Sequence, residues 1–127
     1  MEKPETILQA WLGGVNRRNI EFILSLYNKN AILIPTFSNR ILDSSERIRI
    51  YFEQFRNRDD LNVSLHEKTV KIQQLEENIF ALSGIYTWHF SVENEPLTFE
   101  ARFSMLLNLK FTSPIVHHHS SQIPRML

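Results

Sequence analysis

The side chains of this sequence best suited to chemistry gather in its last quarter, residues 99–124. An arginine, Arg102, lies in one apolar run, and three consecutive histidines, His117, His118 and His119, lie in the next. Both runs read as strands, whose side chains alternate between faces, so we expect His117 and His119 on one face and His118 on the other, toward a second copy of the chain. Apolar residues around Arg102 occur at both parities, which predicts a strand covered on both faces. An arginine buried there needs an anionic or hydrogen-bonding partner.

Arg102 is the sharpest candidate for a binding residue. A guanidinium group offers a planar fork that pairs with a carboxylate through two hydrogen bonds. The alternative is an internal ion pair with Glu100, which lies two positions away and therefore on the same face of the strand. We favour the binding interpretation and predict an enclosed pocket around Arg102 for a small carboxylate or a similar anion.

The pair His117 and His119 has three interpretations. Histidines at i and i+2 of a strand converge and could bind a metal, but a third ligand would have to come from His66, His89 or a glutamate, and no spacing supports any of them. The two imidazoles could instead exchange hydrogen bonds with a pocket ligand, or fill an interior or an interface. We therefore predict neither a metal site nor a cofactor, and keep both histidines as candidates for binding a ligand.

Four aromatic residues complete the predicted ligand-binding site: Trp11, Tyr27, Tyr51 and Tyr86. The tyrosine hydroxyls could orient a ligand. Trp11 is the largest group on an apolar helical stripe, where core packing is the favoured interpretation and a pocket wall the alternative. In both cases its indole N–H needs a partner.

Composition and charge exclude several classes of protein. Fourteen basic and fourteen acidic residues give a formal net charge of zero, whereas a nucleic-acid-binding surface needs a basic excess. Cysteine is absent, which excludes disulfides, thiolate metal sites and a cysteine nucleophile. No apolar run approaches the roughly 20 residues of a membrane span, and the first residues lack the pattern of a secretory signal. A cytoplasmic protein of one domain, residues 1–127, with no nucleic-acid or membrane partner, is expected.

Two helices are expected at the start of the chain. Residues 4–18 carry apolar side chains at helical spacing. Gly13 and Gly14 weaken this helix, and we expect them to let another element pack closely. Asn19 suits the N-cap of a second, short helix that ends near residues 28–30.

A short strand at 31–35 and a third helix at 44–58 are expected next. Asp43 with Glu46 three residues later resembles a capping box at the start of this helix. The helix also carries several arginines, which could indicate a membrane-binding or calmodulin-binding surface. We interpret them as a solvated face, because glutamates dilute the charge and the apolar stripe is needed for the core.

From about residue 62 the chain is expected to form strands. Apolar residues change parity along the first of them, which predicts a bulge or bend at 66–69. Turns are expected at 75–78 and 93–96. Gly84, in the middle of the strand 79–92, indicates a bend or a close backbone approach.

This order of elements predicts an α+β fold in which three N-terminal helices pack on a strongly bent antiparallel sheet. Such a sheet, wrapped on helices, forms a cone with an open mouth. Because both parities of the last two strands are apolar, we expect a second copy of the chain to cover the sheet face that the helices leave free.

The sequence also resembles a known family, the association (hub) domain of calcium/calmodulin-dependent protein kinase II. That family closes with a histidine-x-histidine strand, two small residues and a proline, matched here by His117, His119, Ser120, Ser121 and Pro124. Arg102 matches an arginine on the preceding strand, and segments 48–52 and 81–86 look similar. More broadly, the chain resembles the nuclear transport factor 2-like superfamily, which includes SnoaL-like proteins.

The resemblance implies a cone-shaped nuclear transport factor 2-like fold, homodimers through the sheet face, and rings of dimers. It also implies a pocket between sheet and helices, lined partly by arginine, that holds a small carboxylate. In one departure, the family carries a second arginine about where this chain has Thr87. Neither kinase activity nor calmodulin binding follows from the resemblance.

Two functions are compatible with these observations. The favoured one is a non-enzymatic homo-oligomeric module with a pocket for a small anionic ligand. The alternative is a cofactor-free SnoaL-like isomerase, dehydratase or cyclase, with His117 or His119 as base, Arg102 holding an anionic intermediate, and an apolar substrate near Trp11, Tyr86 or Trp88. Enzymes of this superfamily use an aspartate or a histidine–aspartate pair as base, and no expected strand of this chain carries an aspartate.

Overall fold

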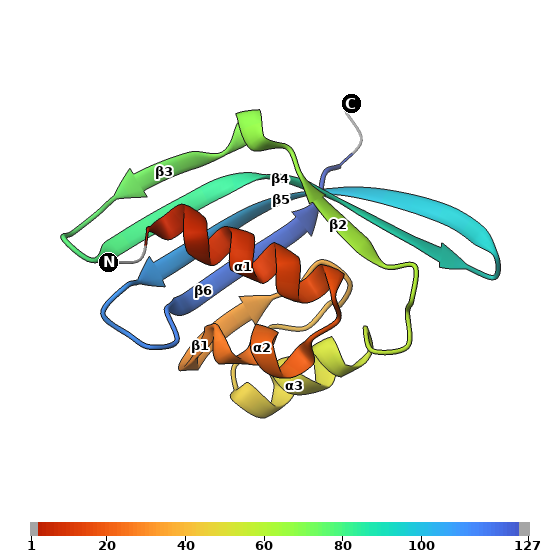
Figure 1. Cartoon of the computed structure of the whole chain (residues 1–127), viewed down its shortest axis with the longest axis horizontal. Coiled ribbons are helices and arrows are strands. Elements are labelled where there is room, and N and C mark those ends of the chain that lie inside the picture. Colours follow the sequence, from red (N-terminus) through yellow and green to blue (C-terminus); the bar gives the residue numbers. More distant parts are fainter. Residues whose placement is uncertain (1–2, 125–127) are drawn as a thin grey trace.

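One six-stranded sheet carries the fold, and three helices cover one of its faces (Figure 1). The computed structural model describes residues 3–124; positions 1–2 and 125–127 of the predicted 1–127 domain lie outside the described residues. The long strands β4 (Ile79–Val92) and β5 (Glu95–Asn108) curve around the helical layer and extend beyond it as a hairpin (Figure 1). This arrangement confirms the predicted α+β class with a strongly curved sheet.

The helices are shorter than predicted: α1 is Pro4–Asn16, α2 is Ile20–Ser25 and α3 is Ser45–Glu53. The side chain of Asn19 caps α2 by accepting a hydrogen bond from the Phe22 amide, as predicted. The predicted capping box at Asp43 is wrong, because Ser44 is the N-cap of α3 and accepts from the Arg47 amide. Asp43 instead forms an exposed ion pair with Arg47.

The first strand begins earlier than predicted. β1 (Tyr27–Ile34) starts just after α2, and Tyr27 pairs with Ile115 of β6 (Ile115–Gln122). The predicted extension of the second helix through residues 28–30 is therefore wrong. The side chains of Tyr27, Ala31 and Leu33 are buried in the core between sheet and helices, and they point there from a strand that pairs with β6, not from a helical stripe.

The sheet order is β1-β6-β5-β4-β2, with β3 also paired to β4. β1 runs parallel to β6, and the other pairs are antiparallel. The strands are β1 Tyr27–Ile34, β2 Asn62–Leu65, β3 Lys71–Gln74, β4 Ile79–Val92, β5 Glu95–Asn108 and β6 Ile115–Gln122. The first strand of the chain thus lies beside the last one. It forms one edge of the sheet, next to α2 and α3 (Figure 1).

Two local predictions about the backbone are confirmed. The 3₁₀ helix η1, Glu67–Thr69, lies at the predicted bend between β2 and β3. At Gly84 an added Cβ would lie 3.0 Å from the ring of Phe103, so this glycine permits a close approach of two neighbouring strands. The expectation that Gly13 and Gly14 let another element pack closely is confirmed for Gly14, where a Cβ would lie 3.0 Å from Phe22 of α2, and is wrong for Gly13, where a Cβ would meet only the side chain of Arg17 at the end of the same helix.

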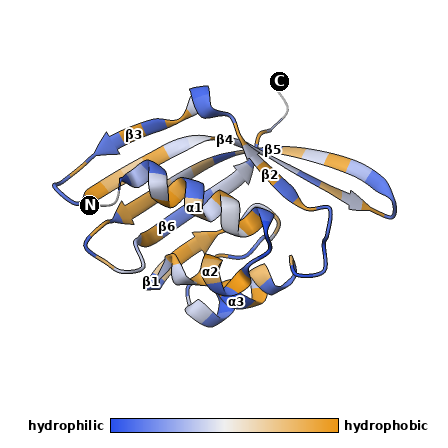
Figure 2. Ribbon diagram, viewed as in Figure 1, coloured by the Kyte–Doolittle hydropathy of each residue, from blue (hydrophilic) through white to orange (hydrophobic). Residues whose placement is uncertain are grey.

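Side chains alternate strictly along the second half of β5, and hydrophobic and hydrophilic residues alternate along the long hairpin (Figure 2). Ala101, Phe103 and Met105 are buried under the helices, whereas Arg102 and Ser104 are exposed on the opposite face. The prediction that Arg102 is enclosed between sheet and helices is wrong. Its parity carries mainly polar residues in this stretch, and no helix among the described residues covers that face.

The faces of the three histidines are the reverse of those predicted. His118 pairs with Met105, shares its inward direction, and is 1% exposed. His117 is half-buried and His119 is exposed, and both point to the outer face of the sheet, opposite to His118. None of the described helices is long and apolar enough to cross a membrane.

Candidate functional site

A buried polar cluster lies at the centre of the interface between helices and sheet, around His118. Its Nδ1 is 2.7 Å from the Tyr27 hydroxyl, and its Nε2 is 3.2 Å from the Tyr86 hydroxyl. The indole N–H of Trp11 donates to the Tyr27 oxygen at 3.0 Å. The four rings come from α1, β1, β4 and β6, so the cluster joins both layers of the fold.

The hydrogen-bond inventory selects one tautomer of His118. Trp11 can only donate, so the Tyr27 oxygen accepts that proton and gives its own to Nδ1 of His118. The proton of a neutral imidazole then resides on Nε2, which donates to the Tyr86 oxygen. The opposite tautomer would leave the buried Tyr27 proton without this acceptor, at a cost of about 1–3 kcal/mol.

The cluster is electrically neutral at physiological pH. Burial lowers the pKa of His118 to about 3, with smaller contributions from the neighbouring His117 and His119. Burial also raises the pKa values of the Tyr27, Tyr51 and Tyr86 hydroxyls above their ordinary range. The site can therefore exchange hydrogen bonds but offers no charge to a bound ion.

Next to this cluster lies a small cavity of about 10 Å³. It is lined by aromatic and hydroxyl-bearing side chains from α1, α3 and the sheet, which include Trp11, Tyr51, Tyr86, Trp88, His118 and Ser120. Trp88 is 2% exposed, and its indole nitrogen is the buried side-chain polar atom without a partner among the described residues. A cavity of this size holds about one water molecule.

The loop between β1 and α3 closes this cavity from outside. The ring of Phe37 packs edge-on against Trp88, Phe90 and Phe99, with centroids 5.3–5.6 Å apart. The Thr36 hydroxyl is hydrogen-bonded to Ser120 on β6. The Phe37 amide donates to the Tyr51 hydroxyl at 3.4 Å. The loop thus contacts β6, the β4–β5 hairpin and α3 at once.

The structure separates the predicted site residues into two groups. Trp11, Tyr27, Tyr51 and Tyr86 meet in the interior, as the members of a single site would. The remaining members, Arg102, His117 and His119, lie on the outer face of the sheet. Sheet backbone separates the two groups, so within residues 3–124 they do not share one pocket.

On the outer face Arg102 pairs in register with Ser121 of β6 and Ile85 of β4. Within residues 3–124 its guanidinium forms no ion pair, so the alternative of an internal pair with Glu100 is not seen. Thr87, at the position where the resembling family carries its second arginine, has its hydroxyl 2.6 Å from His66 Nε2. His119 Nε2 is 2.7 Å from the Ser121 hydroxyl.

Sequence reasoning missed His118 and Ser120 as interior groups. The available signal was the alternation along β5, where Ala101, Phe103 and Met105 form one apolar parity. Residues paired across two antiparallel strands point to the same face, so the inward residues of β5 identify the inward residues of β6. This inference requires the register of the two strands, which the sequence alone does not give. Within the described residues, no three potential metal-ligating side chains come together.

Comparison with known proteins gives one family. The family model for the calcium/calmodulin-dependent protein kinase II association domain matches residues 5–124. No curated protein matches the chain. The match confirms the resemblance found in the terminal strand and spans nearly all of the sequence.

Solved structures show the same fold. A protein from Xanthomonas campestris, described as an association domain of this kinase, has 23% sequence identity and a TM-score of 0.84, over 96% of this chain and 86% of its own. An uncharacterized protein with a cystatin-like fold from Caulobacter vibrioides has 10% identity and a TM-score of 0.78, over 94% and 87%. A ketosteroid isomerase-like protein from Erwinia carotovora atroseptica has 12% identity and a TM-score of 0.74, over 95% and 94%.

Proposed function

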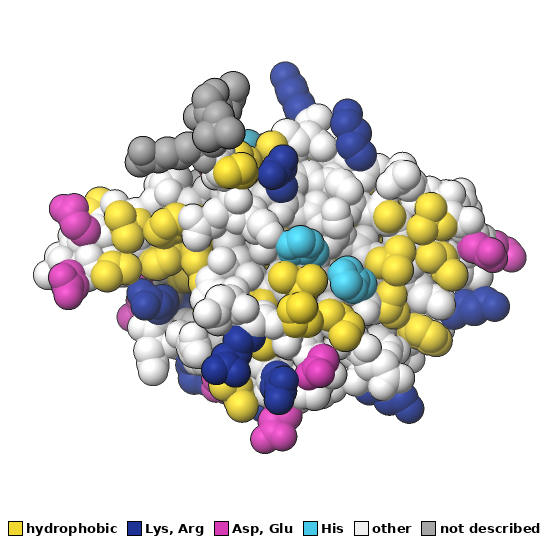
Figure 3. All heavy atoms as spheres, turned by 180° about the vertical axis from the view of Figure 1, so that it is seen from behind, with side chains coloured by type: hydrophobic (Ala, Val, Ile, Leu, Met, Phe, Trp, Pro, Cys, Tyr) yellow, Lys and Arg dark blue, Asp and Glu magenta, His cyan; other side chains and the backbone are white. Residues whose placement is uncertain are grey.

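Since this chain belongs to the calcium/calmodulin-dependent protein kinase II association domain family, we propose that it is a non-enzymatic assembly module. In this proposal two copies pack together through the outer faces of their sheets. The observation that carries it is a broad sheet face that no helix of the described chain covers and that mixes apolar side chains with single charges (Figure 3). The family name, association domain, supports the same function.

The outer face has a row of side chains suited to an interface. The strand register aligns Ile32 of β1, His117 of β6, Leu106 of β5 and Ala81 of β4 across the sheet. Ile32 lies on the edge strand β1, and the other three residues lie on interior strands of the sheet. All four side chains are only half-buried. Burying such a row against a second copy removes apolar area from water, worth about 25 cal/mol per Å².

The exposed area of the chain agrees with a missing partner. The chain exposes 8019 Å², against about 7,000 Å² for a compact monomer of 15.0 kDa. The extended β4–β5 hairpin and the sheet face without helices both contribute to this excess of about 1,000 Å² (Figure 1), and a standard interface buries roughly 800 Å² of each partner. Zero net charge adds little repulsion between copies.

Arg102 and Glu100 give this face charge complementarity with itself. Both side chains are exposed on the same face of β5, two residues apart, and they do not pair within the chain. In a two-fold dimer the same patch of both copies meets, so Arg102 of one copy can pair with Glu100 of the other. The carboxylate predicted for Arg102 would then belong to the partner copy.

The enzymatic alternative has weaker support. Its proposed bases, His117 and His119, and its anion holder, Arg102, lie on the outer face, away from the interior aromatic residues. The interior cavity of about 10 Å³ is far below the roughly 300 Å³ at which ligand pockets begin. His118 is the interior imidazole, and both its nitrogens already have tyrosine partners.

Light scattering coupled to size-exclusion chromatography tests the assembly. Wild-type protein is expected to be a dimer or a multiple of dimers at micromolar concentrations. Leu106→Glu places a carboxylate in the apolar row and should weaken the dimer by about 30-fold or more, the cost of a typical hot-spot loss of about 2 kcal/mol. Ile50→Glu is the matched control, because Ile50 is 57% exposed on α3 and far from this face.

A charge exchange identifies the interface. Arg102→Glu should weaken association, and adding Glu100→Arg should restore it, because the exchanged pair is complementary again. A monomeric wild type, or a Leu106→Glu protein that associates as tightly as wild type, would contradict the proposal.

A further inference from the structure

The apolar row proposed for the dimer interface contains one titratable side chain, His117 of β6. It aligns across the sheet with Ile32, Leu106 and Ala81, and its ring is half-buried in the single chain. Histidine side chains lie in the middle of this face, between apolar patches (Figure 3). Histidine is the side chain whose charge ordinarily changes between pH 5 and pH 8. An interface built on this row therefore contains a group that acid can charge.

The groups packed beside His117 cannot neutralise an imidazolium ion. On the same face, its neighbours on the flanking strands are apolar side chains and one hydroxyl: Leu106 and Ser104 on β5, and Ile32 and Ile34 on β1. On its own strand the next outward residue is His119, whose Nε2 is 2.7 Å from the Ser121 hydroxyl. Neither β1 nor β6 carries an acidic residue. A proton taken up by His117 therefore remains an uncompensated charge.

Fixed charges on this face lie farther away. On β5, Arg102 and Glu100 are four and six positions from Leu106, which is about 13 and 20 Å at the rise of a strand. Lys71 of β3 points to the same face, three strands from β6, about 14 Å at the spacing of neighbouring strands. These two cations are closer to His117 than the carboxylate of Glu100 is. All three distances exceed the Debye length of about 8 Å in physiological salt.

Association changes the surroundings of this imidazole in two ways. In a two-fold dimer the same patch of both copies meets, so two His117 side chains enter one interface. Removal from water disfavours the charged form of each ring, and two charged rings in one interface repel each other. The dimer therefore binds fewer protons than two separate chains do, and falling pH shifts the equilibrium toward the separate chains.

We propose that His117 is an acid-sensitive switch of the assembly: dimers form at neutral pH and separate into folded single chains as the pH falls toward 5. This inference rests on the proposed association through the outer face. An imidazole that must stay neutral in the dimer costs a factor of about ten in association for each pH unit below the ordinary histidine value of about 6.5. Two such rings should raise the dissociation constant about 100-fold between pH 7.5 and pH 5.5.

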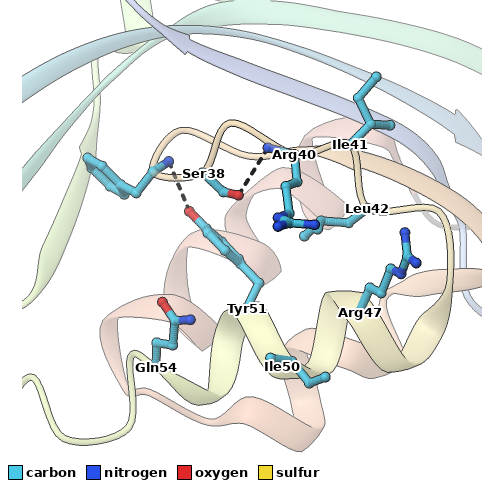
Figure 4. A pocket seen from close by; sticks show the side chains of 9 residues that line it. Ser38, Arg40, Ile41, Leu42, Arg47, Ile50, Tyr51 and Gln54 are labelled. Carbon is cyan, nitrogen blue, oxygen red and sulfur yellow. Dashed lines mark hydrogen bonds between the residues drawn. The ribbon is translucent and has the colours of Figure 1, made fainter.

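A contact through the helical side of the molecule would not respond to acid in this way. The hollow between α3 and the loop that joins β1 to α3 is lined by Arg40 and Arg47, and by Ile50, which is 57% exposed (Figure 4). None of its nine lining residues is a histidine or an acidic residue, and arginine stays charged at every pH in this range. Acid dissociation through His117 therefore also distinguishes the outer face from this hollow as the place of association.

Sedimentation velocity at pH 7.5, 6.5 and 5.5 and constant salt measures the dissociation constant and tests the inference. His117→Gln keeps a polar side chain but cannot titrate, so its dissociation constant should change less than about threefold over this range. His117→Lys carries a permanent charge and should associate at pH 7.5 about as weakly as wild type does at pH 5.5. His119→Gln is the matched control on the same face; because His119 is exposed and lies outside the row, this variant should keep most of the wild-type change.

Tryptophan fluorescence at each pH separates dissociation from unfolding, and native emission at pH 5.5 is expected. An equal acid effect in wild type and His117→Gln would overturn the inference, because His118, unchanged in both, would then be the cause. Wild-type dimers that are equally tight at pH 7.5 and pH 5.5 would also overturn it and would leave the assembly proposal intact. A wild type that is monomeric at pH 7.5 would instead contradict the assembly proposal, and this inference with it.

Discussion

Acid should destabilise this protein through His118, and the effect can be calculated. The folded pKa of this imidazole is about 3 because burial disfavours its charged form, while an unfolded histidine titrates near 6.5. The unfolded state therefore binds more protons between these values, so the stability is present above pH 6.5 and is lost as pH falls toward 3. From pH 7 to pH 5 the loss is about 2 kcal/mol, at about 1.36 kcal/mol for each unit of pH below the unfolded pKa.

Urea unfolding followed by tryptophan fluorescence measures this loss, because Trp11 is buried against the imidazole and Trp88 is buried against Trp11. Protein concentration must be the same at both pH values, because association adds to apparent stability. The groups around His118 are tyrosine hydroxyls on both nitrogens and the flanking His117 and His119. The hydroxyls stay protonated throughout this pH range.

Two variants isolate the contribution of His118. His118→Gln keeps a hydrogen-bonding side chain but cannot titrate, so it should lower stability at pH 7 and flatten the change between pH 7 and pH 5 by about 2 kcal/mol. His119→Gln removes an exposed histidine from the next position and should keep the wild-type change. Equal pH dependence in wild type and His118→Gln would show that the buried imidazole does not control acid stability and would refute the reasoning.

Two further predictions concern the helix–sheet interface and the packing of α1 on α2. Tyr27→Phe removes the oxygen that accepts a buried indole proton and donates to His118, and should cost about 2–4 kcal/mol in urea unfolding by leaving two buried groups unpaired; a cost below 1 kcal/mol would contradict the assigned hydrogen bonds. Gly13→Ala and Gly14→Ala form a matched pair in α1: at Gly13 the new methyl meets only the end of a flexible arginine, so thermal stability should rise by about 1 kcal/mol. At Gly14 the methyl would lie 3.0 Å from Phe22, and stability should fall by about 1–3 kcal/mol; a stabilised Gly14→Ala protein would show that α1 and α2 are not held at this distance.

Helix positions were the part of the fold most accessible from sequence. The apolar spacing in 4–18 and 44–58 predicted α1 and α3, since burial of one stripe follows directly from a period of 3.6 residues. Asn19 was recognised as a cap because its side chain acts on a backbone amide only three residues away. Such features depend on neighbours in the chain, and so a single sequence contains them.

The start of β1 was less accessible. Tyr27 continues the helical spacing of α2, but it lies in a strand because β6, nearly ninety residues away in sequence, offers it parallel pairing. That pairing replaces the local helical hydrogen bonds with long-range ones. The stability gained from this pairing depends on a partner strand, and no local sequence pattern reveals where that strand lies.

The same distinction between local and long-range contacts applies to the candidate site residues. The sequence by itself determined which residues share a face: Arg102 with Glu100, His117 with His119, and His118 opposite to them, because strand side chains alternate. Only the tertiary structure decided which face the helices cover, and it placed His118 inside and Arg102 outside. The physical reason is that the two faces of a strand are equivalent until other elements pack on one of them, and that choice is made by contacts between segments far apart in the chain.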